Sequence, residues 1–214
     1  MKYNNFIGYL TFPSGKVLVS DPCYVKKGGK QIDENETGKS SVSFWTLEVK
    51  ESEHWQATAV LHNESGWGMR VMKLRVAVSG WDDFDRNCSG VWSRPVKMKV
   101  ATVHNDAGMI MIADREALSG WGEDEYVEPL SAFAGQLNYS GACYAANDFA
   151  GLIGASKHSL PISVAVVSSS GYGDGQYEVF VWLDYDNDIV AIEVNYEDED
   201  EDEEDEDDEE EEEN

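Results

Sequence analysis

The sequence has little cysteine, little proline, little positive charge and no long apolar run. Its 214 residues include 3 Cys and 5 Pro, and 16 Lys or Arg stand against 42 Asp or Glu. The cysteines Cys23, Cys88 and Cys143 are odd in number and lack Cys-x-x-Cys spacing, which argues against both a disulfide framework and a zinc cluster. Such cysteine usage favours a reducing, cytoplasmic location.

Membranes and nucleic acids are poor candidates as partners of this chain. No segment approaches the roughly 20 consecutive apolar residues that cross a bilayer. The N-terminal residues also lack the apolar core of a signal peptide. A net charge of −26 repels nucleic acid unless a local basic patch dominates. We therefore expect no membrane insertion and no direct binding of nucleic acid.

Common catalytic motifs are missing as well. The sequence contains no G-x-G-x-x-G, P-loop, H-E-x-x-H or G-x-S-x-G motif, which mark many nucleotide-binding proteins, zinc peptidases and serine hydrolases. No spacing pairs Cys23 with a histidine, and the setting that would activate its thiol cannot be read from sequence. We therefore assign no catalytic residue.

The sequence is rich in acidic residues at its C-terminal end. Residues 197–213 are 17 consecutive Asp or Glu, and without them 25 acidic and 16 basic residues leave a net charge of −9. A block of like charges repels itself and cannot bury apolar surface. We therefore expect a single β-rich domain over residues 1–196 and a disordered polyacidic tail over 197–214. The tail either engages basic partners or only keeps the protein in solution.

Most periodic segments of residues 1–196 predict strands, because β-branched and aromatic residues alternate with polar ones. The pattern indicates a mainly β fold, an antiparallel sandwich or a partly closed barrel, with one or two short helices. Residues 143–156 are the best helix candidate. Two hairpins are predicted, the first joining 6–12 to 16–20 and the second joining 176–183 to 189–195.

Basic residues occupy the outward positions of two predicted strands, with Lys73 and Arg75 on one and Lys97 and Lys99 on the other. If these strands paired, the four cations would form a positive stripe over which the acidic tail could fold back. The alternative is an ordinary solvated sheet face, since exposed ion pairs are worth only about 0–1 kcal/mol.

Two turn segments combine carboxylates with glycine or proline, Ser20–Tyr24 and Ser170–Tyr177. Proline restricts the preceding Asp21 to extended conformations, and glycines permit positive φ on both sides of Asp174. Such turns join strands, or they hold a ligand or divalent cation through oxygen atoms. The candidate ligand or structural residues are Asp21, Cys23, Tyr24, Asp106, Gly173, Asp174, Gly175 and Tyr177. The metal alternative requires Asp21, Asp106 and Asp174 to converge.

These segments resemble an uncharacterised bacterial and phage family, domain of unknown function forty-two forty-one. The resemblance rests on Ser14–Val17 with Asp21-Pro22, on Asp106–Gly108 followed by Asp114, and on Ser170–Tyr177 with the hairpin after it. Tyr172 and Glu178 stand where the family has Trp and Pro. The resemblance implies a small, mostly β domain without an established activity, and the acidic tail is most similar to phage-encoded members.

The resulting hypothesis is a non-enzymatic interaction protein of phage origin that binds a host or phage macromolecule in the cytoplasm. We expect a basic protein surface as the partner, with the acidic tail assisting through its field. The alternative is a small-ligand or metal-binding module, or an enzyme, with its site near Asp21, Asp106 and Asp174. A third hypothesis, a structural protein that self-associates, remains open.

Overall fold

The computed structural model describes residues 2–31, 44–50, 54–79, 95–122, 126–155 and 162–197. Its strands are β1 (Lys2–Leu10), β2 (Lys16–Ser20), β3 (Val25–Lys26), β4 (Lys30–Gln31), β5 (Phe44–Glu48), β6 (Trp55–Glu64), β7 (Gly68–Val78), β8 (Val96–Asn105), β9 (Met109–Asp114), β10 (Ala150–Ile153), β11 (Ala165–Ser169), β12 (Gly175–Leu183) and β13 (Ile189–Asn195). The helical elements are the α-helix α3 (Tyr139–Asn147) and the 3-10 turns η1 (Pro22–Tyr24), η3 (Ala117–Gly120) and η4 (Leu130–Phe133).

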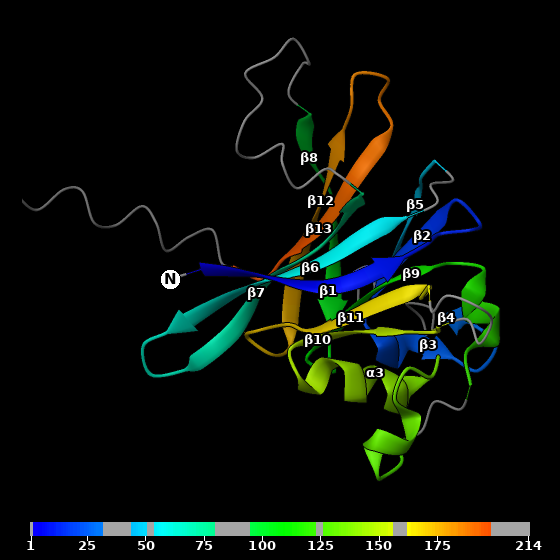
Figure 1. Cartoon of the computed structure of the whole chain (residues 1–214), viewed down its shortest axis with the longest axis vertical. Coiled ribbons are helices and arrows are strands. Elements are labelled where there is room, and N and C mark those ends of the chain that lie inside the picture. The colour runs from blue at the N-terminus through cyan, green and yellow to red at the C-terminus, as the bar shows by residue number, and fades with distance from the viewer. Residues whose placement is uncertain are drawn as a thin grey trace, which may run out of the picture.

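The strands form two facing antiparallel sheets with a helical layer beneath (Figure 1). The six-stranded sheet has the order β1-β6-β7-β13-β12-β8, and the five-stranded sheet has the order β10-β11-β9-β2-β5. Neither sheet closes into a barrel, so the mainly β sandwich is confirmed. Helix α3 packs on β9, β10 and β11 at the outer side of the five-stranded sheet (Figure 1).

The main core lies between the two sheets. Trp55 at the start of β6 is fully buried, and Phe12 meets its ring edge-on at 5.3 Å between centroids. Inward positions of both sheets supply the aliphatic residues around this pair, among them Val17, Val19, Leu74, Val76, Ile110, Ile112, Val166, Val179, Ile192 and Val194. Period-two alternation predicted the inward positions of β7 correctly at Leu74 and Val76. It was wrong for β8, where Val96 and Met98 alternate with Lys97 and Lys99 but are 61% and 48% exposed.

A second core covers the opposite face of the five-stranded sheet. Every residue of β9 is buried, because Ile112 faces the other sheet while Met111 faces α3 and η3. A strand covered on both faces needs apolar residues at consecutive positions. This explains the unbroken apolar run of Met109–Ala113.

Two sequence-based expectations are wrong in detail. β1 and β2 do not pair as a hairpin; β1 pairs with β6, whereas β2 pairs with β5 and β9. The chain crosses from one sheet to the other at the turn after Phe12, so the turn signal was correct but the pairing was not. The hairpin of β12 and β13 is confirmed.

The helix predicted over 143–156 begins earlier and ends earlier. Its N-cap is Asn138, whose side chain accepts a hydrogen bond from the Gly141 N–H at 2.7 Å. Phe149 adopts a φ of 76°, after which β10 pairs with β11. Gly151 lets β10 approach the helix, since a Cβ there would lie 3.1 Å from Ala145. No helix in the described ranges is long and apolar enough to cross a membrane.

The layered packing predicts that two consecutive residues of β9 are equally sensitive to truncation. Ile112→Ala and Met111→Ala should each lower the free energy of unfolding by about 2–5 kcal/mol, because each opens a cavity in one of the two cores. Urea unfolding followed by tryptophan fluorescence would measure the free energy of unfolding. The control is Val96→Ala, because the Val96 side chain is 61% exposed. A negligible effect of Met111→Ala would contradict the helical cover.

Candidate functional site

The three sequence segments singled out as candidate sites lie together in the fold. Asp21, just after β2, bonds to the turn between β8 and β9 at Asp106 and Ala107. That same turn meets the glycine-rich turn before β12, because the Ser170 N–H donates to the Gly108 carbonyl at 2.9 Å. The three segments therefore meet in the fold, whereas the metal alternative would also require the carboxylates of Asp21, Asp106 and Asp174 to converge.

Asp21 ties two of these segments through backbone hydrogen bonds. Its side chain is fully buried and accepts from the Cys23 N–H at 2.7 Å through Oδ1. Its Oδ2 accepts from the Asp106 and Ala107 N–H groups, each at 2.7 Å. Burial raises the pKa of Asp21 above its ordinary value, and these N–H donors oppose that rise only in part. The carboxylate is committed to holding the backbone.

Asp106 is the more accessible carboxylate of the site, with 38% of its side chain exposed. It accepts from the Tyr24 hydroxyl at 2.5 Å and lies 2.9 Å from His104 Nε2. Burial raises the pKa of Tyr24, and donation to Asp106 raises it further. The phenol is therefore neutral at physiological pH and serves as a hydrogen-bond donor.

The two described cysteines, Cys23 and Cys143, are both half-buried and carry no disulfide. Burial raises the pKa of the Cys23 thiol, and the nearby charge of Asp21 raises it further. Burial also raises the pKa of Cys143. A nucleophilic cysteine needs a lowered pKa and a positive setting. The surroundings of these thiols therefore work against nucleophilic catalysis; Cys88 lies outside the described residues.

The glycine-rich turn is organised around one carbonyl oxygen, that of Gly173. It accepts from Asn105 Nδ2 at 3.0 Å, from Ser170 Oγ at 2.6 Å and from Tyr177 Oη at 2.9 Å. Gly171 lies against β7, where a Cβ would come within 2.1 Å of the Val71 carbonyl oxygen. Both glycines have positive φ. The turn thus joins the two sheets; Gly171 is needed for close approach to β7, and Gly173 for its positive φ.

Asp174 lies at the exposed tip of that turn, beside Gly175, which pairs with Asn105. It does not complete a group of three metal-ligating side chains with Asp21 and Asp106. In the part of the chain that the structure describes, the one such group is Asp184, Asp186 and Asp188, whose ligand atoms lie within 4.8 Å of one another. The metal alternative at Asp21, Asp106 and Asp174 stays a prediction.

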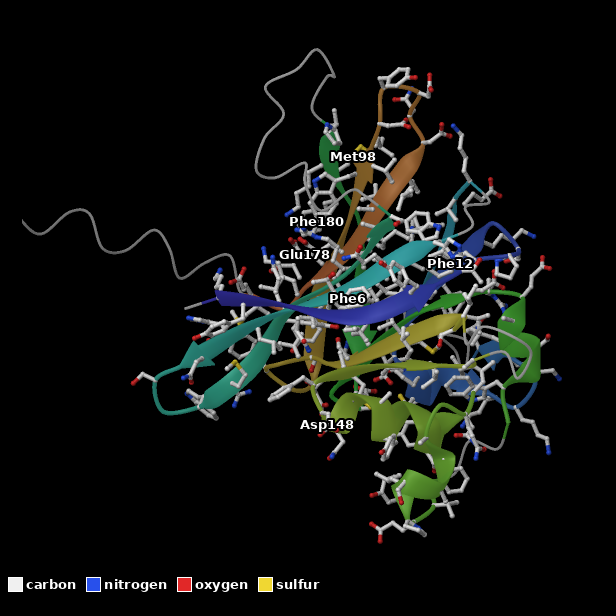
Figure 2. The ribbon with its side chains drawn as sticks, viewed as in Figure 1. Phe6, Phe12, Met98, Asp148, Glu178 and Phe180 are labelled. Atoms are coloured by element: carbon white, nitrogen blue, oxygen red, sulfur yellow. The ribbon has the colours of Figure 1, made fainter. Side chains whose placement is uncertain are left out.

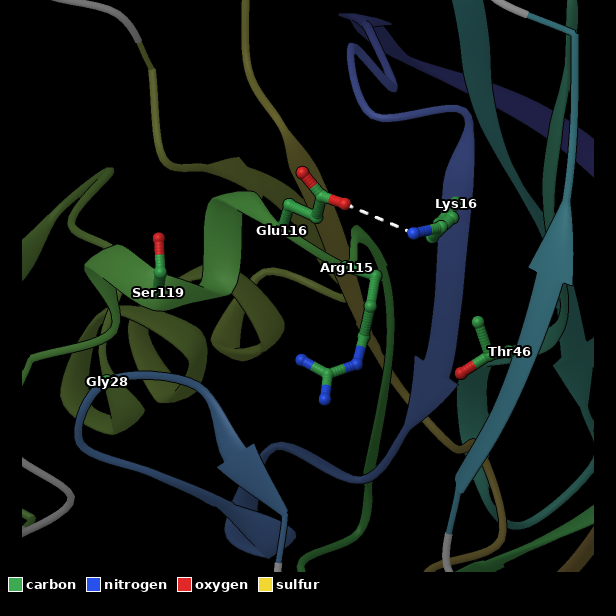
Figure 3. Close-up of a pocket in the computed structure, with 6 residues that line it drawn as sticks. All are labelled: Lys16, Gly28, Thr46, Arg115, Glu116 and Ser119. Carbon is green, nitrogen blue, oxygen red and sulfur yellow. Dashed lines mark hydrogen bonds and ion pairs between the residues drawn. The ribbon is translucent and has the colours of Figure 1, made fainter.

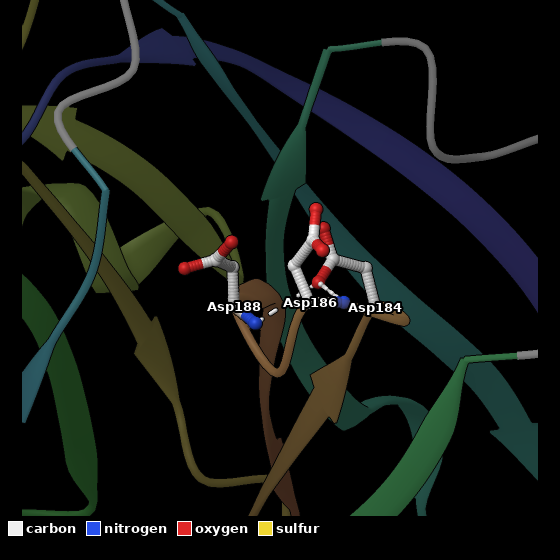
Figure 4. A group of neighbouring side chains, drawn as sticks. All are labelled: Asp184, Asp186 and Asp188. Atoms are coloured by element: carbon white, nitrogen blue, oxygen red, sulfur yellow. Dashed lines mark hydrogen bonds between the residues drawn. The ribbon is translucent and has the colours of Figure 1, made fainter.

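The Asp184–Asp188 group occupies the β12–β13 turn (Figure 4). One oxygen of Asp184 accepts from the Asp186 N–H at 3.0 Å and from the Asp188 N–H at 2.9 Å. Asp188 also pairs with Lys50. Such hydrogen bonds are those of an Asx-type turn that closes a hairpin. The clustering of the three carboxylates is therefore explained by the turn itself.

The predicted positive stripe does not form. β7 and β8 are not neighbours, because β13 and β12 lie between them and supply carboxylates on the same face. Figure 2 shows one of these, Glu178, together with Phe180 on β12. The buried Glu193 carboxylate accepts two hydrogen bonds from Arg75 at its Oε2 atom, one from Nη2 at 2.6 Å and one from Nε at 2.9 Å. The remaining cations pair as Lys97 with Glu193, Lys99 with Glu178, and Lys73 with Glu197.

Exposed aromatic residues gather around the tip of the β6–β7 hairpin. Trp67 is 73% exposed, yet the Arg70 guanidinium lies 4.8 Å from its ring centroid. The same guanidinium lies 5.7 Å from the ring of Tyr172 and donates to the Gly171 carbonyl. One arginine thereby holds two exposed rings in place. We call Trp67, Arg70 and Tyr172 the Trp67 cluster.

The acidic segment starts beside this cluster. Tyr196 N–H donates to the Met72 carbonyl at 2.8 Å, and Glu197 then pairs with Lys2 and, at 3.1 Å, with Lys73. Partial burial favours a higher pKa for Glu197, but the bonds from Lys2 and Lys73 outweigh it and lower that pKa. The predicted tail therefore begins at a fixed point; its residues 198–214 lie outside the described residues.

Comparisons with known proteins add no relative. A scan against protein-family models gave no match, and searches of curated proteins and of solved structures gave none either. The resemblance to domain of unknown function forty-two forty-one, and the phage origin that it implies, stay predictions.

Sequence reasoning did not single out the Trp67 cluster. The segment Ser65-Gly66-Trp67-Gly68 has the composition of an ordinary turn. A tryptophan between two glycines at a hairpin tip cannot reach the core of its own sheet, and this was the available signal. Arg70 carried no signal, because its contacts with Gly171 and Tyr172 join segments about a hundred residues apart.

The close contact at Gly171 gives a matched pair of substitutions. Gly108→Ala, at a φ of 65° with open space around the Cβ, should cost about 1–2 kcal/mol of unfolding free energy from backbone strain alone. Gly171→Ala has the same φ within a degree but adds the clash with Val71, so its loss should be larger by about 1–3 kcal/mol. Equal losses in denaturant unfolding would contradict the contact.

The raised pKa of Asp21 predicts a particular dependence on pH. The folded state holds a proton on Asp21 at pH values where the unfolded chain has released it, so this contribution is complete below 3.8 and is lost as the pH rises through the folded pKa. The stability advantage of wild type over Asp21→Asn should therefore grow as the pH falls from 7 towards 4. Urea unfolding at several pH values measures it. An advantage that shrinks would mean that the three N–H donors outweigh burial.

Proposed function

We propose that this protein is a non-enzymatic interaction protein that binds a basic protein surface through the Trp67 cluster, with residues 197–213 providing an attractive field. The main support is the exposure of Trp67, which Arg70 holds in one place while it stays open to solvent. Tryptophan, tyrosine and arginine are the residues that most often dominate binding energy at protein interfaces. A pre-positioned ring also loses little conformational entropy on binding.

The position of Glu197 supports a role for the acidic segment in the same interaction. Its ion pairs with Lys2 and Lys73 place the start of the segment beside the β7 strand that carries Arg70. Sixteen further acidic residues follow in the sequence. A field of this kind raises association rates with basic surfaces and weakens with salt. Short-range contact and long-range attraction thus originate at one end of the molecule.

The chemistry of the Asp21 region favours this function over catalysis. The Cys23 thiol and the Tyr24 phenol are held neutral by burial, and the Asp21 carboxylate is committed to backbone donors. Phage origin and cytoplasmic location belong to this proposal as expectations. The identity of the partner, host or phage, is left to the experiment.

The test is capture on immobilised protein, with quantitative mass spectrometry of what a bacterial lysate leaves bound. Trp67→Ala should reduce capture of one basic protein about 30-fold or more at every salt concentration, as loss of an interface hot spot does. Truncation after Glu197 should reduce capture mainly at low salt, because the field is screened at about 0.5 M. Beads carrying polyglutamate alone define non-specific capture.

Tyr185→Ala is the matched control, since Tyr185 is 68% exposed but lies in the β12–β13 turn, away from the Trp67 cluster. It should leave capture unchanged. Capture that depends on the tail alone, or is equal for Trp67→Ala and wild type, would overturn the proposal. Capture only of further copies of this chain would instead favour the self-associating structural protein, and sedimentation would then show oligomers.

A further inference from the structure

A second feature, far along the chain from the Trp67 cluster, is an open cavity of about 650 Å³ at one end of the five-stranded sheet (Figure 3). Its volume lies in the range of small-molecule sites. Five separate elements or turns contribute to its wall, so it is a product of the tertiary fold. The lining residues are Lys16, Gly28, Thr46, Arg115, Glu116 and Ser119.

The central group of this cavity is the Arg115 guanidinium, which lies between the Gly28 turn and Thr46 (Figure 3). Its backbone is fixed because its N–H donates to the Lys16 carbonyl at 2.8 Å. One side-chain nitrogen, Nη1, donates to the Gly29 carbonyl at 3.3 Å. Arginine has five N–H donors in a rigid fork, so most of the fork is left for a ligand.

Neighbouring carboxylates do not neutralise Arg115. Asp114 precedes it, but both oxygens of Asp114 accept hydrogen bonds from other groups, among them the Ser14 N–H at 2.8 Å and the Ala117 N–H at 2.8 Å. Glu116 follows it and pairs with Lys16 at 3.2 Å. Within the described ranges, no carboxylate lies within ion-pair distance of Arg115. Among the residues that the structure describes, half-buried Arg115 therefore has no acidic partner, although the chain carries a net charge of −26.

The wall is also held by contacts that do not involve Arg115. Gly28 N–H donates to the Trp121 carbonyl at 2.9 Å, which docks the β3–β4 turn on the end of η3. Gly29 has a φ of 75° and approaches η3 so closely that a Cβ would lie 2.5 Å from the Leu118 carbonyl oxygen. A rigid wall opposite a fixed guanidinium is the arrangement that binds planar or tetrahedral oxyanions.

We propose that this cavity binds a small hydroxylated molecule that carries one phosphate or carboxylate group, and that Arg115 is the main contact of that group. Thr46 and Ser119 supply hydroxyls that suit a ligand with hydroxyl groups of its own. Glu116, which pairs with Lys16 in the wall of the cavity, repels a second anionic group on the ligand. The proposed ligand therefore has a single anionic group, as a sugar phosphate or a sugar acid does.

The experiment is calorimetric titration of the full chain with four probes, which are glucose 6-phosphate, gluconate, inorganic phosphate and glucose. At least one hydroxylated anion should bind saturably, one molecule per chain, and glucose should not bind. The phosphate and carboxylate arms identify the head group. Arg115→Met should weaken binding about tenfold or more, and Arg115→Lys should weaken it also, because the charge remains but the fork is lost.

Two further variants keep the proposal falsifiable if Arg115 variants fold poorly. Glu116→Gln, at an exposed side chain, should strengthen anion binding several-fold because it removes the competing carboxylate. Lys99→Met removes one positive charge from the six-stranded sheet and should leave binding unchanged. Absence of saturable binding up to about 10 mM, which corresponds to about −2.7 kcal/mol, would overturn the proposal, as would equal binding by wild type and Glu116→Gln.

Discussion

The fold depends on one buried carboxylate, that of Asp21. It receives three backbone N–H bonds from two segments that lie about 85 residues apart, and it fixes the end of β2 to the turn between β8 and β9. The strands on either side of that turn belong to different sheets. The carboxylate therefore sets how the two sheets meet at this end. Buried polar groups are costly unless their partners are complete, which makes such a junction specific as well as stabilising.

The same junction explains why the Cys23 thiol and the Tyr24 phenol are held in their neutral, less reactive forms. Cys23 and Tyr24 lie two and three residues after Asp21, where burial and nearby carboxylates both raise the pKa of the thiol and of the phenol and so favour their neutral forms. The features that suit recognition lie elsewhere, at the Trp67 cluster and at the Arg115 cavity. The residues that stabilise the fold are thus separate from those proposed to bind partners. Asp21 holds the junction of the two sheets, whereas Arg70 lies beside exposed aromatic rings and Arg115 lies in an open cavity.

Much of the fold was predictable from local pattern, and the errors have a common cause. The alternation in β7 and the apolar run of β9 gave the correct strands, because burial on one face or on two leaves a direct trace in sequence. Pairing left no such trace. β1 was expected to pair with β2 but pairs with β6, and the two basic strands are not neighbours, since β7 pairs with β13. Turn signals show where a strand ends but not which sheet receives the next one.

Composition and spacing by themselves determined a mainly β body, a separate acidic segment and two turn segments that combine Asp with Gly or Pro. These features follow from charge repulsion, side-chain periodicity and the backbone preferences of each residue. Only the tertiary structure decided that Asp21 accepts three backbone N–H bonds, that Glu193 and Glu178 pair with the basic residues of β7 and β8, and that Arg70 and Arg115 lie where they do. The physical reason is that hydrogen bonds and ion pairs depend on distances of a few ångströms between segments far apart in the chain, and local sequence does not encode those distances.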